Sequence, residues 1–78
     1  MTIVKDDDVL SGDPRIEGHR VTVYHVLRAT EDFSGVDSAA RELRIPIEDV
    51  IEALRYAKNH PHEIAEIERE YQKLQRNQ

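Results

Sequence analysis

The chain has 78 residues, of which 38% are hydrophobic and 35% charged, and its formal net charge is −5. A chain this short forms one domain with a thin core, so we expect a second copy or another protein to help stabilise it. The absence of cysteine excludes disulfides and thiolate metal clusters. The acidic balance argues against strong nonspecific nucleic-acid binding. No signal peptide or membrane-spanning run is recognisable, which indicates a cytoplasmic protein without a membrane partner.

The N-terminal part predicts a short strand and a hairpin. The strand is expected over Thr2–Lys5, which carries β-branched residues, and the acidic run Asp6–Asp8 ends it as a solvated loop without the ligand spacing of a calcium site. Further on, the runs Arg15–Ile16 and Arg20–Val23 flank Gly18. Because glycine takes positive φ readily, this arrangement favours a tight hairpin.

Two short amphipathic helices are predicted next. The first covers Val23–Thr30 with Thr22 as its N-cap, and the second covers Val36–Leu43 with Ser34 or Asp37 as its cap. Apolar residues recur at helical spacing and predict the inward faces. These are Val23, Val26, Leu27 and Thr30 in the first helix, from which His25 is offset, and Val36, Ala39, Ala40 and Leu43 in the second.

A third helix is predicted from Pro46 to Asn59. Proline suits the first helical position and disfavours helix at the residue before it, Ile45. Glu48 and Asp49 lie in the first turn, where the helix macrodipole favours anions. The predicted buried stripe consists of Ile47, Val50, Ile51, Leu54 and Ala57.

Pro61 breaks the helical path at His60, and a last helix is predicted over Pro61–Lys73 or beyond. Its apolar residues form a narrow seam with charges on the other positions. Such a seam is too weak to hold a free helix in water, so it must dock on its own domain, on a second copy or on another protein. We predict partner binding by this C-terminal seam: Ile64, Ile67, Tyr71 and Leu74.

Catalytic and metal chemistry are not indicated. No nucleophile with a nearby base, no pair of carboxylates in a pocket and no phosphate-binding loop stands out, so we expect no enzymatic activity, cofactor or small-molecule substrate. His60, His62 and Glu63 have metal-ligand character. A further ligand would have to come from His19 or His25, and roles at helix ends explain the cluster better.

Direct DNA reading by the third helix is disfavoured, because Glu48, Asp49 and Glu52 at its start repel phosphates. Basic residues could still form a nucleic-acid surface on a dimer. The candidates are Arg20, Arg41, Arg44, Arg55 and Lys58, with Arg15 and Arg28 in addition. The alternative is that each is solvated or paired with neighbours such as Glu17 and Glu42.

Together, the elements predict a mainly α fold of the homeodomain-like or helix-turn-helix type. It is a three-helix bundle with an N-terminal β-hairpin and a C-terminal helical extension. We assign residues 1–60 to the hairpin and bundle, and residues 61–78 to the C-terminal amphipathic helix.

Two segments resemble a small prokaryotic family, domain-of-unknown-function family four-three-three. Ser11–Val23 is similar to its signature Gly-Lys-Pro-x-Ile-x-Gly-Thr-Arg-Ile-Pro-Val, and Ile47–Ala57 is similar to its acidic helix start followed by Ala-Leu-x-Tyr-Ala. His19 and Thr22 stand where the family usually has Thr and Pro. The matching motif positions are Gly12, Pro14, Ile16, Gly18, Arg20 and Val23.

The resemblance implies a homeodomain-like fold and an antitoxin role, commonly as the partner of a PIN-like ribonuclease toxin. We therefore expect a homodimeric antitoxin that neutralises such a toxin through its C-terminal helix or the adjoining acidic surface, with operator DNA as a second partner. Two alternatives remain open. One is a stand-alone helix-turn-helix transcriptional regulator, and the other is a structural oligomerisation module that uses the C-terminal seam.

Overall fold

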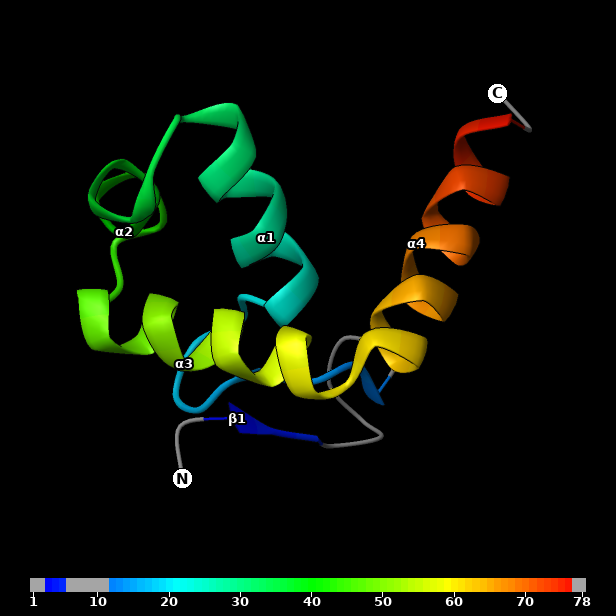
Figure 1. The fold of residues 1–78 in the computed structure, drawn as a ribbon, viewed down its shortest axis with the longest axis horizontal. Coiled ribbons are helices and arrows are strands. Elements are labelled where there is room, and N and C mark those ends of the chain that lie inside the picture. Colours follow the sequence, from blue (N-terminus) through cyan, green and yellow to red (C-terminus); the bar gives the residue numbers. More distant parts are fainter. Residues whose placement is uncertain (1–2, 6–11, 77–78) are drawn as a thin grey trace.

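The computed structural model describes residues 3–5 and 12–76, and helices make up most of this part. The elements are β1 (Ile3–Val4), β2 (Arg15–Ile16), α1 (Val23–Asp32), α2 (Val36–Leu43), α3 (Ile47–Asn59) and α4 (Pro61–Arg76). The mainly α prediction is therefore confirmed. α1, α2 and α3 pack against one another as a body, and α4 leans away from it (Figure 1). Thr2, the acidic run Asp6–Asp8 and Ser11 lie outside the described residues.

The turn around Gly18 closes as predicted. The amide of Ile16 donates to the carbonyl of Val21 at 2.8 Å, and the amide of His19 donates to the carbonyl of Ile16 at 3.1 Å. Gly18 has φ of +82°, and a Cβ atom added there would meet nothing within 4 Å. The positive φ, rather than crowding, is therefore what requires glycine at this position.

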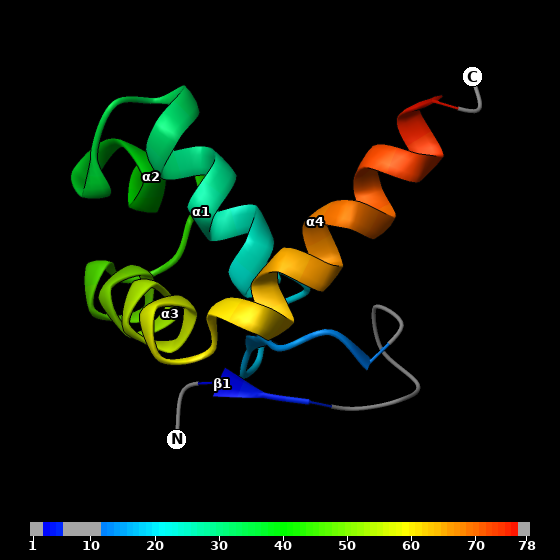
Figure 2. The same ribbon diagram turned by 45° about the vertical axis from the view of Figure 1, so that its right-hand side comes forward.

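The second arm of the predicted hairpin is not a strand. β2 pairs instead with β1 in antiparallel orientation, with Ile3 opposite Ile16. The segment Arg20–Val23 contributes an isolated bridge between Arg15 and Thr22. Because Thr22 is already the N-cap of α1, the chain enters the helix before a second strand can extend. The small sheet lies beneath α3 and contacts it (Figure 2).

Replacing Gly18 with valine should destabilise the fold by about 1–3 kcal/mol, the usual cost of forcing a side chain into a sparsely populated backbone region. Asparagine tolerates left-handed geometry, so Gly18→Asn is the matched control and should lose much less. Urea unfolding monitored by circular dichroism measures both free energies of unfolding. Equal stability of the valine variant and the wild type would mean that the turn relaxes without strain.

The predicted helices form with nearly the expected bounds, but the cap of α2 is different. The N-cap is Gly35, and it makes no side-chain capping hydrogen bond. Ser34 has φ of 60°, whereas a capping serine needs extended backbone geometry. Asp37 lies inside the first turn of the helix. The capping prediction was wrong because the chain reverses through two residues with positive φ before α2 begins.

The core lies between the sheet, α1 and α3. Its fully buried large side chains, each at most 1% exposed, include Ile16, Val23, Val26 and Val50. In α2 the predicted small residues Ala39 and Ala40 face inward and are buried. Because small side chains allow close approach of the backbones, they let a short helix pack tightly on its neighbours.

The structure corrects one part of the buried apolar stripe that was predicted for α3. Val50 and Ala53 are buried, and Leu54 packs at the edge of the core. Ile47 and Ile51, however, are 38% and 44% exposed. The apolar stripe of α3 is wider than the surface that the rest of the body covers, so its outer edge remains in solvent.

α4 begins at Pro61 and runs to Arg76, in agreement with the prediction of a helix over Pro61–Lys73 or beyond. The preceding residue, His60, is the C-cap of α3, and its amide donates to the carbonyl of Ala57 at 3.3 Å. This matches the role predicted for His60. None of the helices in the described part of the chain combines the length and apolar character needed to cross a bilayer.

Candidate functional site

The most developed polar arrangement lies where α4 meets the body, and we call it the α4 junction. It joins side chains from the N-terminal strand region, α1, α3 and α4: Lys5, Asp13, Thr22, Tyr24, His25, Tyr56, Glu63 and Tyr71. These residues are distant in sequence, and the approach of α4 to both α1 and α3 brings them together. The junction therefore determines how α4 is held.

Glu63 in the first turn of α4 accepts two hydrogen bonds. One comes from Lys5 Nζ at 2.6 Å, and the other comes from the Tyr56 hydroxyl. Burial alone would raise the pKa of Glu63, but the hydrogen bonds from Lys5 and Tyr56 outweigh it and lower the pKa. Burial and the bond to Glu63 raise the pKa of Tyr56 to about 12. At neutral pH the site thus contains a charged carboxylate held by a protonated tyrosine and a lysine.

Aromatic side chains form the next contact along α4. The rings of Tyr24 and Tyr71 stack with centroids 4.6 Å apart and an interplanar angle of 11°. The ring of His25 meets Tyr71 edge-on, with centroids 6.4 Å apart. Burial, followed by the nearby charge of Asp13, raises the pKa of the Tyr71 hydroxyl. Stacking of this kind contributes about 0.5–1.5 kcal/mol beyond area burial, so it helps to fix α4 against α1.

A capping box lies directly behind this aromatic contact. Thr22 Oγ1 accepts from the amide of His25 at 3.0 Å, and His25 Nδ1 accepts from the amide of Thr22 at 3.2 Å. The second bond requires an unprotonated Nδ1, so the imidazole is neutral. Burial lowers the pKa of His25, while the charge of Asp13 opposes that shift. A capping box usually has Glu or Gln at this position, which makes the histidine an unusual, titratable cap.

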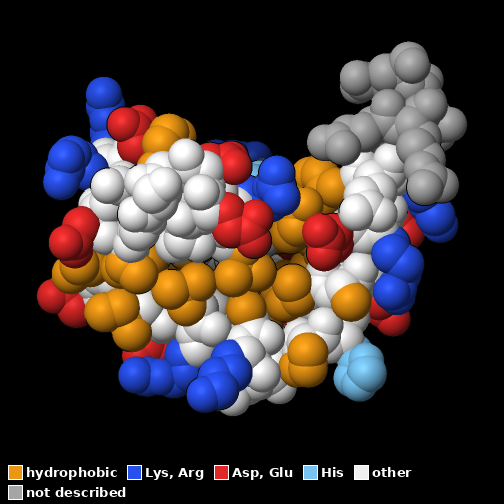
Figure 3. Space-filling model, turned by 45° about the horizontal axis from the view of Figure 1, so that its top comes forward, with side chains coloured by type: hydrophobic (Ala, Val, Ile, Leu, Met, Phe, Trp, Pro, Cys, Tyr) orange, Lys and Arg blue, Asp and Glu red, His pale blue; other side chains and the backbone are white. Residues whose placement is uncertain are grey.

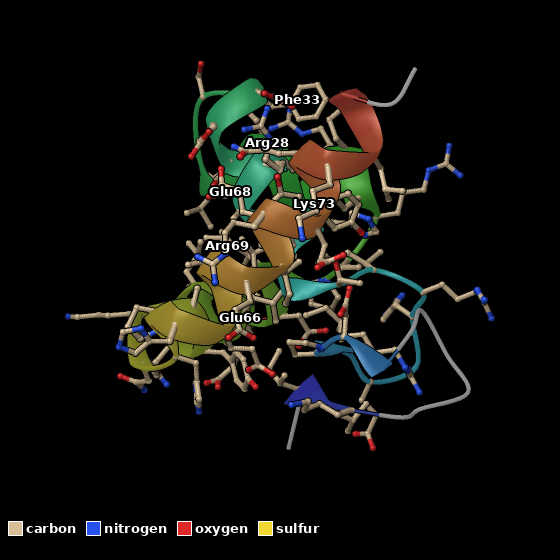
Figure 4. The ribbon with its side chains drawn as sticks, turned by 90° about the vertical axis from the view of Figure 1, so that its right-hand side faces the viewer. Arg28, Phe33, Glu66, Glu68, Arg69 and Lys73 are labelled. Atoms are coloured by element: carbon tan, nitrogen blue, oxygen red, sulfur yellow. The ribbon has the colours of Figure 1, made fainter. Side chains whose placement is uncertain are left out.

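A groove of about 690 Å³ runs along α4 beside the junction. The side chains that line it are mainly charged: Asp13, Glu63, Glu66, Arg69, Glu70 and Lys73, together with Ile67, Tyr71 and Leu74. Figure 4 shows Glu66, Arg69 and Lys73 following one another along α4. Acidic groups outnumber basic ones in this lining, although Glu63 is bonded to Lys5 and Glu70 Oε1 lies 3.8 Å from Lys73 Nζ.

The predicted C-terminal seam is divided between two environments. Ile64 packs against the core, Ile67 is 9% exposed, and Tyr71 stacks on α1. Leu74 is 65% exposed. The first three residues of the seam therefore dock on their own domain, and only Leu74 at the distal end remains open to another molecule.

The predicted nucleic-acid residues come from separate elements. Arg20 lies in the turn before α1, Arg41 in α2 and Arg44 at its C-cap, and all three are exposed. Arg55 Nη1 is 2.9 Å from Glu52 Oε1 in α3, and Lys58 is exposed in the last turn of that helix. The described residues thus contain exposed basic side chains at the candidate positions, with Arg55 already paired within its helix.

Two further arginines have local partners. Arg15 Nη1 donates to the carbonyls of Ile16 at 3.4 Å and His19 at 3.2 Å, which ties it to the turn. Arg28 Nη1 lies 3.5 Å from Glu31 Oε2 in α1. Arg15 is consequently a residue of the fold in this structure, and Arg28 matches the alternative of pairing with a neighbour.

The signature residues lie in the segment that leads into α1. Ile16 and Val23 are fully buried, and the carbonyl of Pro14 accepts from the amide of Val23 at 2.9 Å. Gly12 and Gly18 both have positive φ, and Arg20 is exposed. Apart from that arginine, each has a geometric role in shaping or packing the turn.

Metal ligation finds no support in the described part of the chain, where no group of three or more His, Asp or Glu side chains could hold an ion. His60 Nδ1 lies 2.9 Å from the carbonyl of Tyr56, and its ring stacks on Tyr56 with centroids 4.0 Å apart. Its surroundings are those of a helix cap.

Sequence reasoning missed most of the α4 junction. Thr22 was predicted as a cap, and the spacing to His25 is that of a capping box, so this signal was present in the sequence. Tyr56 and Glu63 are seven residues apart but lie on different helices. Their contact, like the stacking of Tyr24 on Tyr71, depends on the direction that α4 takes after Pro61, which no local pattern specifies.

Comparison with known proteins gives one assignment. Comparisons with curated proteins and with solved structures gave no match. The family model described as "Protein of unknown function (DUF433)" matches residues 3–57, which include the small sheet and most of the α1–α3 body but not α4. This is the family that the motifs at Ser11–Val23 and Ile47–Ala57 resemble. Because the match covers more than half of the chain, the protein belongs to the DUF433 family.

Proposed function

We propose that this protein is a non-enzymatic, cytoplasmic antitoxin that acts as a dimer and neutralises a PIN-like ribonuclease by docking the distal end of α4 on it. The observation that carries the proposal is the 65% exposure of Leu74 near the end of α4, where this helix diverges from the α1–α3 body. A large apolar side chain in that position is suited to insertion in a groove of another protein.

The charges beside Leu74 support a ribonuclease as the partner. Asp13, Glu66 and Glu70 line the groove along α4, and two cations, Arg69 and Lys73, only partly balance the acidic groups. A surface that binds RNA is basic, because it must neutralise phosphates. An acidic helix therefore complements it, which speeds association and sets the register of docking.

The test is a single substitution at the exposed end of the helix. Leu74→Lys should weaken binding to a co-expressed PIN-like ribonuclease by at least about tenfold, because it removes the apolar anchor and adds a charge that a basic cleft repels. Calorimetric titration of the purified pair measures the affinity. Deletion of residues 65–78 should abolish co-purification, but it also removes the buried Ile67, so the point variant is the more specific test.

Phe33→Lys is the matched control. Phe33 is also an exposed apolar residue, at 45%, but it lies at the C-cap of α1. The Phe33→Lys variant should leave the affinity for the ribonuclease unchanged. The same affinity for Leu74→Lys and the wild type, with both proteins folded, would exclude docking through the end of α4.

The alternative function is DNA binding by a homeodomain-like or helix-turn-helix bundle. The mutual packing of α1, α2 and α3, with the short connection from Arg44 to Pro46 between α2 and α3, supports it. The acidic start of α3 opposes it, because Glu48 is exposed where bases and phosphates would lie. A gel shift with operator DNA at rising salt tests this function, and the absence of a shift at low salt would exclude it.

A further inference from the structure

α3 has an apolar edge that stays partly exposed in the part of the chain that the structure describes. Ile47 and Ile51 are 38% and 44% exposed, and Leu54, one turn further on, is only partly buried. Lys58 continues the row, so the residues follow one another at spacings of four, three and four. We call Ile47, Ile51, Leu54 and Lys58 the α3 seam. A row with this spacing is typical of the contact line between two helices packed side by side. A band of hydrophobic side chains crosses the body in Figure 3.

The charges beside the α3 seam indicate which molecule it fits. Glu48 and Arg55 occupy equivalent flanking positions, each one residue after an apolar member of the seam, and both are exposed. They have opposite signs and are placed almost symmetrically about Ile51. When two copies of α3 pack in antiparallel orientation, Glu48 of each copy lies opposite Arg55 of the other. The surface is thus complementary to itself, as a two-fold interface requires.

We propose that the α3 seam is the interface of a homodimer in which two α3 helices pack antiparallel across a two-fold axis. Ile51 of each copy packs near the axis against Leu54 of the other, and Ile47 packs against the aliphatic part of Lys58. Two Glu48–Arg55 ion pairs, one on each side, fix the register, and in forming them Arg55 exchanges its exposed pair with Glu52 of its own helix for Glu48 of the other copy. This inference deepens the dimer in the proposed function and rests on it, but it assigns the dimer contact to α3 and leaves α4 for the toxin.

The proposed interface also bears on DNA binding. In the dimer, the exposed face of α3 is covered by the second copy, so it cannot enter a major groove. Any DNA contact then has to come from residues outside this helix, such as Arg41 and Arg44, which are exposed in and after α2. The dimer therefore predicts that Arg55→Ala weakens self-association rather than DNA binding.

The test uses paired charge reversals in the full chain. Glu48→Arg and Arg55→Glu should each weaken dimerisation by about tenfold or more, because each places like charges at both symmetric contacts. An equimolar mixture of the two variants should regain the dimer, since a mixed pair joins opposite charges at both contacts. Analytical ultracentrifugation over a range of concentrations measures the dimer dissociation constant, and circular dichroism confirms that each variant is folded.

The outcome separates this interface from the toxin-binding surface. Ile51→Lys should give a folded monomer that still binds the toxin, whereas Leu74→Lys should remain a dimer and lose the toxin. Phe33→Lys is the control that should change neither property. A monomeric wild type at the highest concentration, or a mixture no more dimeric than the separate charge variants, would overturn the assignment of the dimer to α3.

Discussion

Replacing Ile67 with alanine should destabilise the protein by about 2–3 kcal/mol, because it removes a buried side chain and leaves a cavity that α4 cannot easily close. Ile67 is 9% exposed and lies between Glu63 and Tyr71, the residues that hold α4 to the rest of the domain. For a domain of this size the thermal midpoint should fall by roughly 10 °C. Circular dichroism should also show a loss of helical signal, since an isolated helix of this length is marginal in water.

Leu74→Ala is the matched control for that experiment. The residue lies on the same helix, seven positions further along, and is 65% exposed, so its truncation should change the free energy of unfolding by less than about 0.5 kcal/mol. Similar losses for the two variants would contradict the division of the C-terminal seam into a docked part and an exposed part. An unchanged stability of Ile67→Ala would mean that α4 is not held on its own domain.

The sequence predicted the helices well because their boundaries have local causes. Pro61 begins α4 and Thr22 caps α1, as predicted, and Pro46 is the N-cap of α3, one residue before the helix that was predicted to start on it. Each of these signals acts within one turn of the residue that carries it. The cap of α2 was predicted less well, since Ser34 is a good capping residue by type but has a left-handed backbone.

Long-range pairing was beyond what the sequence could specify. A residue run such as Arg20–Val23 has strand character, yet it is the distant β1 that pairs with β2. Hydrophobic spacing also predicted the inward side of α3 correctly at Val50 but could not set the width of the covered surface. Whether Ile51 is buried depends on how much of the surface of α3 the other elements cover, and this follows from the packing of the whole domain.

The same reasoning explains the candidate sites. Sequence spacing identified the C-terminal seam, but only the tertiary structure shows that Tyr71 stacks on Tyr24 while Leu74 remains exposed. Because most of α4 contacts its own domain, only its distal end is available to a partner. On α3 the opposite holds, because Ile47 and Ile51, which were expected in the core, are exposed and available as a binding surface.

Acidification from about pH 7.5 to about pH 5.5 should destabilise the wild-type protein through His25 by about 1 kcal/mol, the scale of a helix cap. Burial lowers the pKa of His25 below its ordinary value of 6.5, although Asp13 opposes the shift. The unfolded chain therefore binds a proton at a higher pH than the folded chain does. The contribution of neutral His25 to stability is therefore complete above pH 6.5, and it is lost as the pH falls toward the lower pKa of His25 in the folded protein. Protonated Nδ1 cannot accept from the amide of Thr22, which gives the loss its structural cause.

His25→Gln is the variant that isolates this effect, because glutamine is a usual capping-box residue whose side-chain oxygen accepts the same bond without titrating. The free energy of unfolding in urea, measured at both pH values, should change less in the variant than in the wild type by about 1 kcal/mol. Asp13→Asn should enlarge the loss of stability on acidification. The charge of Asp13 favours protonated His25, and the raised pKa of Asp13 itself makes the folded protein more stable as the pH falls. The variant removes both of these compensating effects. A pH dependence that is identical in His25→Gln and the wild type would show that the capping box does not titrate, because His19, His60 and His62 are present in both proteins.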